Sequence, residues 1–564
     1  MRKVAIVLVA ILMGAAAYAQ VPRVLSPGHA MLHLDVTGKY LILPVQESAP
    51  NSNVKVIASG EQKQSFNIKL AADKVDYFVP LDIGRFGSRS LVLDFSIPGE
   101  KNSPEAILKQ VCWKVIRQDD SFDTTNRERF RPVYHHTPAY GWMNDPNGMF
   151  YKDGLYHLYY QWNPYGSQWE NMTWGHSVSP DMIHWLAMPA AIEPDALGTI
   201  FSGSAVVDVN NTSGYGKGVV VALFTSAGRN QTQSMAYSTD DGRMFTKYVS
   251  NPVITGNVND FRDPKAFWNK EAGMWNLILA AGQEVRLYSS RDLKEWKYES
   301  SFGEGHGCHS SVWECPDLME LDVRGTGRKM WLMIVNNGGA PAGGSGTQYF
   351  VGEFDGHEFK TSQVEAQWMD YGKDHYATVT FDNAPGGRKI AMAWMSNWEY
   401  SGGVPTLQFR SADSVPRDLD IFEHDGKYYC GVTPSPELLA LRGKVVKKPT
   451  EACEIVVDLK KSATMVLSNP AGEEVVMEYD SKAGTFSMDR TRSGETSFHK
   501  GFPTKTVAPL HGPLRQVRIF IDRSSIEAFD SEGKMAMTNL VFPSEPYDSF
   551  SVKGGKAVIY SITE

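Results

Sequence analysis

Three acidic residues occupy matching places in a chain of 564 residues, each near the start of a predicted β-strand. They are Asp145 in WMNDPNG, Asp263 in FRDP and Glu314 in WECPD. Proline follows Asp145 and Asp263 directly, and it follows Glu314 after one further residue. Because proline restricts the residue before it to extended conformations, we expect it to hold the acids rigidly where the strands begin. Asp-Pro is also a common turn dipeptide, so it is the recurrence of the pattern that indicates chemistry.

Carboxyl groups that lie close together are suited to the cleavage of acetals. One group donates a proton to the leaving oxygen, and an ionised one attacks or stabilises an oxocarbenium-like centre. Crowding of negative charge raises the pKa of at least one group, which keeps a proton available near neutral pH. The neighbouring segments contain aromatic and amide side chains that fit either a sugar pocket or core packing: Trp142, Asn144, Gln161, Trp162, Asn163, Trp169, Trp174 and Phe201.

The elements that carry these acids repeat along the chain. Apolar, strand-like runs recur at intervals of roughly 60 residues, at 155–162, 219–225, 275–281, 330–335 and 390–394. A second strand candidate precedes each run and begins near Asp145, Phe201, Arg262, Trp313 and Tyr376. Segments with Ser, then Asp, then an aromatic residue predict outer strands at 179–185, 238–245 and 289–296. The spacing predicts a five-bladed β-propeller over residues 130–425, in which the innermost strands bring the acids together; a large sandwich with accidental spacing is the alternative.

The regions on either side of this repeat also show the alternation of β-strands. Apolar residues at every second position, such as Phe66, Ile68 and Leu70, predict a small β-rich domain over residues 20–120. A polar stretch, 117–131, is expected to link it to the propeller. Alternating segments after residue 445 predict a β-sandwich over 445–564. The predicted fold class is therefore all-β throughout.

Composition and the first residues restrict the compartment and the partners. Arg2 and Lys3 precede an apolar run, and Ala17-Tyr18-Ala19 fits a cleavage site, so residues 1–19 are expected to be a signal peptide that exports the protein to the periplasm or beyond. No second long apolar stretch predicts a membrane span. A formal charge of −8 leaves no basic excess for a nucleic-acid partner. Five cysteines, an odd number in a long chain, do not indicate a disulfide scaffold.

One cluster of soft ligands offers a competing interpretation. His306, Cys308, His309 and Cys315 are the residue types of a zinc site. Cys308 and His309 are adjacent, however, and adjacent residues rarely both bind one tetrahedral ion. We therefore expect the cluster to be structural and the protein to need neither a metal nor another cofactor.

The motifs around the acids resemble those of glycoside hydrolase family 32, the invertases, inulinases and levanases. The resemblance covers about residues 130–564 and leaves the N-terminal domain as an addition. The matching segments, in chain order, are Trp142–Gly148, Gln161–Pro164, Phe201–Ala205, Arg262–Pro264, Glu314–Pro316, Asp370–Gly372 with Tyr376-Ala377, and Ile521–Glu527.

This resemblance implies roles for individual residues. Asp145 corresponds to the nucleophile, Asp263 to the transition-state stabiliser and Glu314 to the general acid/base of a retaining enzyme, which requires Asp145 and Glu314 to face each other at about 5–5.5 Å. Arg262 is expected to keep the Asp263 carboxylate ionised. Residues implied in binding the terminal fructosyl unit are Asn144, Gln161, Trp169, Phe201, Ser202 and Arg262.

The expected function is an exported retaining β-fructosidase that hydrolyses levan or inulin and fructosyl oligosaccharides and releases fructose. A sucrose-preferring invertase and an endo-acting levanase remain alternatives within the family. A noncatalytic carbohydrate-binding propeller and an inverting hydrolase of arabinan or xylan are alternatives outside it. The oligomeric state is left open by the sequence.

Overall fold

β-Strands make up almost all regular elements of the computed structural model, which describes residues 21–99 and 103–563. The predicted signal peptide, residues 1–19, lies outside the described residues. No helix in the described part of the chain is long and apolar enough to cross a membrane. The chain divides after Asp123 into two compact units.

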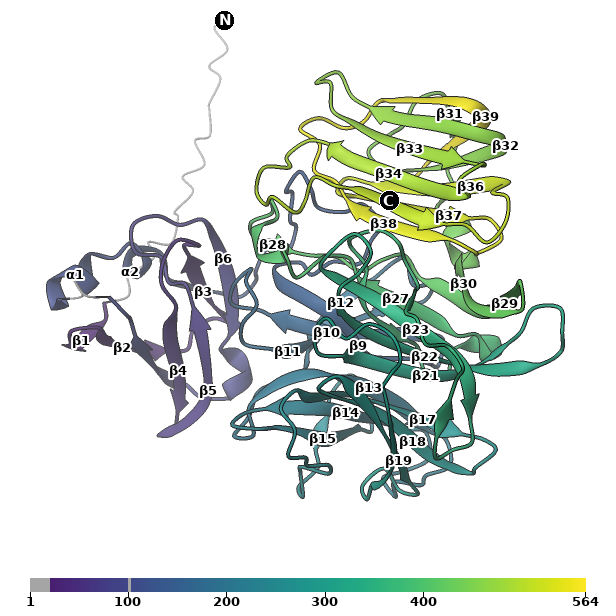
Figure 1. Ribbon diagram of the computed structural model, residues 1–564. Helices are drawn as coiled ribbons and strands as arrows, with labels where there is room; N and C mark the ends of the chain where they lie inside the picture. Colours follow the sequence, from purple (N-terminus) through teal and green to yellow (C-terminus); the bar gives the residue numbers. More distant parts are fainter. Residues whose placement is uncertain (1–20, 100–102, 564) are drawn as a thin grey trace, which may run out of the picture. The chain divides into compact units, whose positions relative to one another are not determined.

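The first unit contains two antiparallel sheets and two short helices (Figure 1). One sheet has the order β1-β2-β7-β4-β5 and the other β6-β3-β8. Because β8 pairs with β3, the polar stretch at 117–131 begins as a strand of this unit. The elements are β1 (Arg23–Ser26), β2 (His29–Asp35), β3 (Tyr40–Val45), β4 (Ser52–Ala58), β5 (Glu61–Ile68), β6 (Tyr77–Asp82), β7 (Ser90–Ser96), β8 (Arg117–Asp119), α1 (Pro104–Lys109) and α2 (Cys112–Val115).

Five sheets of mostly consecutive strands form the larger part of the second unit. Blade I contains β9 (Gly141–Lys152), β10 (Leu155–Asn163), β11 (Thr173–Ser179) and β12 (Leu186–Ile192); blade II contains β13 (Thr199–Asp208), β14 (Val219–Ala227), β15 (Gln231–Ser238) and β16 (Thr246–Lys247). Blade III contains β17 (Phe261–Asn269), β18 (Met274–Ala281), β19 (Glu284–Ser290) and β20 (Lys297–Phe302). Blade IV contains β21 (Glu314–Asp322), β22 (Lys329–Gly338), β23 (Ser345–Phe354), β24 (Phe359–Lys360) and β25 (Gln367–Trp368). Blade V contains β26 (Tyr376–Thr380), β27 (Ile390–Trp394), β29 (Arg417–His424) and β30 (Lys427–Pro434).

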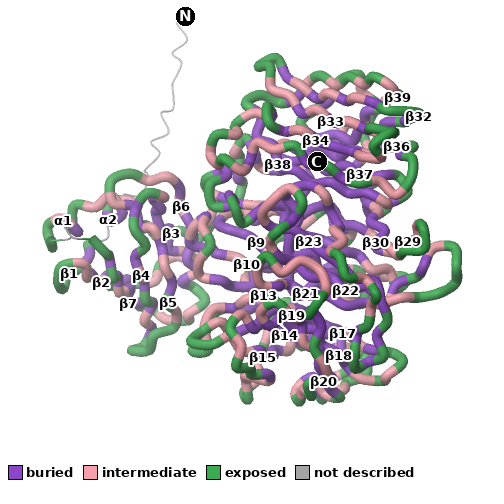
Figure 2. The backbone as a smooth tube through the Cα atoms, viewed as in Figure 1, coloured by how far each residue is buried: buried purple, intermediate pink, exposed green. Residues whose placement is uncertain are grey.

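The first strands of the five blades close into a ring. Strand β9 contacts β13, β13 contacts β17, β17 contacts β21, β21 contacts β26, and β26 returns to β9. A short strand between β27 and β29 of blade V, β28 (Phe409–Arg410), pairs in parallel with β9 and helps to close the ring. These inner strands are buried, whereas the connecting turns are exposed (Figure 2). The predicted five-bladed β-propeller is therefore confirmed.

Each of the five first strands has a β-bulge near its beginning, where two of its residues lie opposite one residue of the next strand. The bulged pairs are Asn144 and Asp145, Phe201 and Ser202, Asp263 and Pro264, Cys315 and Pro316, and Ala377 and Thr378. A bulge bends the strand and changes the direction of a side chain, and such bulges are frequent beside active sites. Asp263 adopts φ +66°, in the left-handed region. The expectation that proline holds this acid in an extended conformation is therefore wrong, because the bulge sets its backbone.

The segments predicted as outer strands are turns between the third and fourth strands of blades I, II and III. In blade I the Ser179 Oγ donates to the Asp181 carboxylate at 3.0 Å, and that carboxylate accepts from the backbone N–H groups of Ile183 and His184. Asp240 and Asp292 accept backbone N–H groups in the same way. Ser and Asp side chains that bond nearby backbone favour turns over strands, which explains the error.

The C-terminal strands form the predicted β-sandwich. The first half of the long strand β32 pairs with β36 and its second half pairs with β33. This one strand therefore belongs to both layers of the sandwich. An apolar core lies between the layers; β37 and β38 are buried, whereas β39 is largely exposed or half-buried (Figure 2). The strands are β31 (Val445–Val446), β32 (Cys453–Ser468), β33 (Glu474–Asp480), β34 (Thr485–Arg492), β35 (Lys505–Pro509), β36 (Gln516–Asp522), β37 (Ser525–Asp530), β38 (Ala536–Leu540) and β39 (Ser549–Ser561).

A fully buried set of charged side chains joins the propeller to the sandwich. Arg417 of β29 donates to Asp370 at 2.8 Å and to Glu527 of the sandwich at 2.6 Å. His135 lies between Glu527 and Asp522, with 2.8 Å to each carboxylate. We call these five residues the interdomain ion network.

Candidate active site

The three predicted acids meet around one residue, Cys315. Its backbone N–H donates to the Asp263 carboxylate at 2.8 Å, and its thiol donates to Asp145 Oδ2 at 3.3 Å. Glu314 directly precedes it in the chain. Three inner strands, β9, β17 and β21, thus contribute one acid each; Asp145 and Asp263 lie within bulges, and Glu314 directly precedes one.

Donors from two blades fix the Asp145 carboxylate. The Asn144 side-chain amide donates to Oδ1 at 2.9 Å, and the Ser202 hydroxyl donates to Oδ2 at 2.7 Å. The Asn144 amide is itself oriented, because the indole N–H of Trp142 donates to its oxygen at 2.8 Å. A carboxylate held in this way presents one orientation to a bound molecule.

Glu314 is in a different environment. The Arg262 guanidinium donates to its Oε1 at 3.1 Å, and the Tyr376 hydroxyl donates to its Oε2 at 2.5 Å. Burial raises the pKa of Glu314, and the negative charge of Asp145 adds to this effect, while Arg262 and Tyr376 oppose it. A raised pKa keeps a proton available on this carboxyl group.

Asp263 is 5% exposed, and burial raises its pKa to about 7. Arg262 lowers the pKa of Asp263, whereas Glu314 and Asp145 raise it further. Arg262 therefore does not keep this group fully ionised as expected, because burial outweighs its charge. Its guanidinium instead bonds Glu314, and on the other side Asp260 at 2.6 Å.

The other residues predicted to bind sugar lie in blades I and II and in the loop between β10 and β11. Gln161 is 2% exposed, and its side-chain nitrogen has no hydrogen-bond partner among the described residues. Such a donor is unusual in a protein interior and is free to bind a hydroxyl group. Trp169 is 46% exposed and packs edge-on against Phe201, with 5.9 Å between the ring centroids.

Tyr376, Cys315 and Trp398 belong to this site but were not predicted as site residues. Tyr376 begins the first strand of blade V, so its place in the repeat was a usable signal. Trp398 is 40% exposed and stacks on Trp142, with 6.0 Å between centroids. Its position follows from the loop after β27, which no periodic pattern marks.

The residues of the predicted soft-ligand cluster, His306, Cys308, His309 and Cys315, lie in different surroundings. Cys315 lies among the acids, whereas His306 Nδ1 contacts the carbonyl of Gln363 at 2.6 Å and His309 Nε2 contacts the carbonyl of His306 at 2.9 Å. Across the described ranges, no three His, Cys, Asp or Glu side chains are arranged to hold a metal ion.

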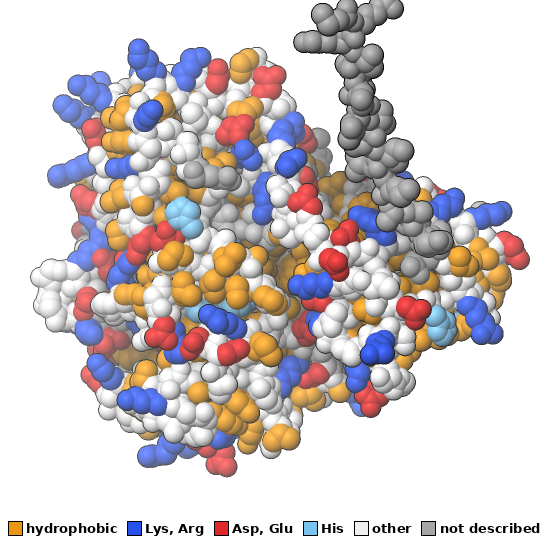
Figure 3. All heavy atoms as spheres, turned by 180° about the vertical axis from the view of Figure 1, so that it is seen from behind, with side chains coloured by type: hydrophobic (Ala, Val, Ile, Leu, Met, Phe, Trp, Pro, Cys, Tyr) orange, Lys and Arg blue, Asp and Glu red, His pale blue; other side chains and the backbone are white. Residues whose placement is uncertain are grey.

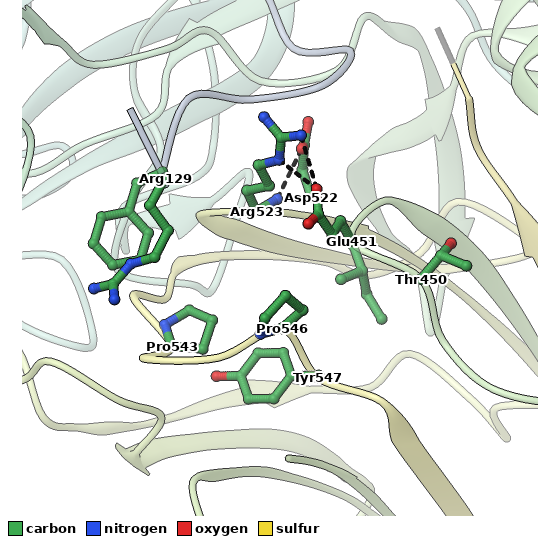
Figure 4. A pocket seen from close by; sticks show the side chains of 10 residues that line it. Arg129, Thr450, Glu451, Asp522, Arg523, Pro543, Pro546 and Tyr547 are labelled. Atoms are coloured by element: carbon green, nitrogen blue, oxygen red, sulfur yellow. Dashed lines mark hydrogen bonds and ion pairs between the residues drawn. The ribbon is translucent and has the colours of Figure 1, made fainter. Parts of the chain in front are cut away.

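A separate pocket lies between residues 129–130 and the sandwich (Figure 4). Arg523 and Glu451 line this pocket, and the Arg523 guanidinium is paired with the Glu451 carboxylate at 2.7 Å. None of the acids of the candidate active site lines this pocket.

On the face drawn in Figure 3, basic side chains are interspersed with acidic ones.

The family model of the glycosyl hydrolases family 32 N-terminal domain matches residues 135–431, and that of the family 32 C terminal matches residues 437–563. The chain belongs to glycoside hydrolase family 32. It is therefore a glycoside hydrolase, as predicted. A third family model, a domain of unknown function (DUF4980), matches residues 26–134, ahead of the family 32 domains.

Relatives within family 32 include enzymes named for fructans. The chain is 43% identical to a levanase of Bacillus subtilis (strain 168) over 76% of this chain and 69% of that protein. It is 35% identical to an extracellular exo-inulinase of Aspergillus niger over 74% of this chain and 90% of that protein.

Solved structures of an exo-inulinase and a fructofuranosidase resemble most of this chain. An exo-inulinase from Aspergillus awamori has a TM-score of 0.73 at 32% identity, covering 78% of this chain and 99% of that one. A fructofuranosidase from Schwanniomyces occidentalis, solved with fructosylnystose, has a TM-score of 0.71 at 31% identity, covering 79% and 99%.

Proposed function

We propose that this family 32 enzyme is an exported, retaining β-fructosidase that hydrolyses levan or inulin and fructosyl oligosaccharides and releases fructose. The observation that carries this proposal is the meeting of Asp145, Asp263 and Glu314 around Cys315. The names of the relatives support a fructan as substrate. The signal-like residues 1–19 and the extracellular relatives support export.

In this proposal Asp145 and Glu314 carry the two steps of the reaction. Asp145 attacks the anomeric carbon of the fructosyl unit while Glu314 donates its proton to the leaving oxygen, so that the glycosidic bond breaks and a fructosyl–enzyme ester forms. Glu314 then removes a proton from water, the water oxygen attacks the same carbon, and Asp145 leaves as a carboxylate. Two displacements retain the configuration, and carboxyl groups alone supply the chemistry.

The remaining site residues bind and orient the terminal fructosyl unit. Asp263 bonds its hydroxyl groups and stabilises the transition state. Arg262 binds a hydroxyl group while it bonds Glu314. Gln161 offers an unpaired amide N–H from β10, opposite the bulge that contains Asn144 and Asp145. The sugar-binding set proposed here is Asn144, Gln161, Trp169, Phe201, Ser202 and Arg262.

Product analysis tests the proposal. The purified protein is incubated with sucrose, inulin and levan in parallel, and the first products are followed by chromatography and by NMR of the anomeric centre. We expect fructose from the fructans with retained configuration. Inversion, or no hydrolysis of any of the three, would contradict the proposal. Faster hydrolysis of sucrose would favour an invertase, and oligosaccharides as first products would favour an endo-levanase.

A further inference from the structure

The guanidinium of Arg262 is shared between two carboxylates on its opposite sides. Its Nε and Nη2 donate to Glu314 Oε1 at 3.3 and 3.1 Å. Its Nη1 donates to Asp260 Oδ1 at 2.6 Å and to Gln231 Oε1 at 3.2 Å. Because the guanidinium is planar and rigid, contacts at Nη1 determine how the opposite edge meets Glu314.

Asp260 is built into the strand connections that also position Glu314. Its backbone carbonyl accepts from the N–H of Gly282 at 3.0 Å. The carbonyl of Gly282 accepts from the N–H of Trp313 at 2.7 Å, and Trp313 precedes Glu314 in the chain. One turn, between β18 and β19, therefore connects Asp260 to the acid/base across two blades. The Asp260 side chain is 41% exposed, so it stands at the rim of the site rather than in its core.

We propose that Asp260 and Gln231 are positioning residues that hold Arg262 against Glu314, and that the charge of Asp260 sets the alkaline limit of the reaction. This inference rests on the proposed function only in naming Glu314 as the acid. Neither residue touches the reacting atoms in the proposed mechanism, and both act through the guanidinium.

The sign of the effect follows from the charges around Glu314. Asp145 and Asp263 repel its ionised form, whereas Arg262 and the Tyr376 hydroxyl stabilise it. Asp260 partly neutralises Arg262 from the far side. Removal of the Asp260 charge leaves more of the positive field of Arg262 on Glu314, so the pKa of Glu314 falls. The acid then loses its proton at lower pH, and the alkaline limb of the rate profile moves downward.

The decisive variant is Asp260→Asn, which keeps an acceptor oxygen and removes only the charge. Asparagine also tolerates the left-handed backbone at this position, where φ is +54°. We expect the alkaline limb of kcat/KM to move down by about half a pH unit. Asp260→Glu keeps the negative charge and should leave the alkaline limb at its wild-type pH. Gln231→Ala should leave the limb in place and raise KM, since it removes a neutral contact that orients Arg262.

The control is Glu304→Gln, the same change of charge at an exposed residue of the loop between β20 and β21. An unchanged limb in Asp260→Asn, or the same shift in Glu304→Gln, would overturn the inference.

A measurement that needs no turnover tests this inference separately from the proposed function. In protein labelled with ¹³C at the glutamate carboxyl groups, the Glu314 resonance is identified by its loss in Glu314→Gln. Its titration midpoint should fall in Asp260→Asn, and an unchanged midpoint would refute the inference even if the wild type hydrolysed no fructan.

Discussion

Two clusters of carboxyl groups in the second unit, one partly and one fully buried, contain the same residue types and differ in how their charges are compensated. The candidate active site gathers Asp145, Asp263 and Glu314, and the interdomain ion network gathers Asp370, Asp522 and Glu527. Burial by itself disfavours the charge in both places. The position of nearby cations then decides whether a carboxyl group keeps a proton.

In the interdomain ion network each carboxylate has a cationic partner with direct contacts. Burial would raise the pKa values of Asp370 and Glu527, but Arg417 and the surrounding hydrogen bonds bring both below their usual range. Burial likewise opposes the charge on His135, yet its bonds to Asp522 and Glu527 raise its pKa to about 9. These groups stay ionised near neutral pH, which suits a structural junction.

At the candidate active site a single guanidinium serves several acids. Arg262 bonds Glu314 and Asp260, and among the described residues no direct ion pair between Arg262 and Asp263 is found. The pKa values of both Asp263 and Glu314 are raised. Incomplete compensation leaves protons available for transfer, and this difference distinguishes the candidate active site from the interdomain ion network.

The largest expected effect comes from Asp145→Asn. We expect kcat on inulin or levan to fall at least ~10³-fold, because the amide cannot form the covalent intermediate. The urea midpoint should stay close to that of the wild type, since asparagine has the same size and keeps one acceptor oxygen, and the Ser202 hydroxyl can rotate to accept from the new amide at a site that is not fully buried. Near-normal turnover in the folded variant would remove Asp145 from the mechanism.

Glu314→Gln should reduce hydrolysis of natural fructans by at least ~10²-fold, because it removes the proton donor. On a fructoside whose leaving group needs no protonation, Glu314→Gln should keep much of the wild-type rate of the first step. Rates are compared for both substrates in the wild type and the variant. Equal losses on the two substrates would show that Glu314 does more, or something other, than donate a proton.

Arg417→Met tests the structural cluster. Removing this cation leaves Asp370 buried without its guanidinium and Glu527 with His135 as its remaining cationic partner. We expect a loss of about 3 kcal/mol in the free energy of unfolding, measured in urea at pH 7. Turnover by the protein that remains folded should change little. Lys448→Met is the matched control, because the Lys448 side chain is 72% exposed beside Asp548 and its removal should hardly move the midpoint. Equal behaviour of the two variants would remove the distinction between the clusters.

Much of the propeller could be predicted because its second strands are long, apolar runs. The run 219–225 lies within β14, which spans Val219–Ala227, and the run 390–394 coincides with β27. Strands β16 and β24 have two residues each, too few to produce a pattern. The Ser-x-Asp segments were misassigned because periodicity carries no information on side-chain bonds to backbone.

The acids of the site were predictable because they recur beside proline at a fixed place in the repeat. The bulges were not, because they depend on the pairing register of two strands. Tyr376 and Cys315 stand at the same point of the repeat as the acids but are not acidic, so a search for carboxyl groups passes over them. Asp260 was missed because its role depends on the direction of the Arg262 side chain.

Of the four variants that test this comparison, Tyr376→Phe is expected to have the smallest effect, and the sign of its effect is opposite to that of Asp260→Asn. The Tyr376 hydroxyl donates to Glu314 Oε2 at 2.5 Å and stabilises the ionised carboxylate. Phenylalanine removes that bond without changing the shape of the ring, so the pKa of Glu314 should rise and the alkaline limb of kcat/KM should move up by about one pH unit.

The matched control for this change is Tyr371→Phe, five positions earlier in the chain, where the ring packs against the sandwich core. It should leave the limb in place. A downward shift in Tyr376→Phe, or an equal shift in both variants, would show that the hydroxyl does not act on Glu314. Tyr376 acts on Glu314 directly and Asp260 acts on it through Arg262. The double variant with Asp260→Asn should therefore return the limb toward its wild-type position.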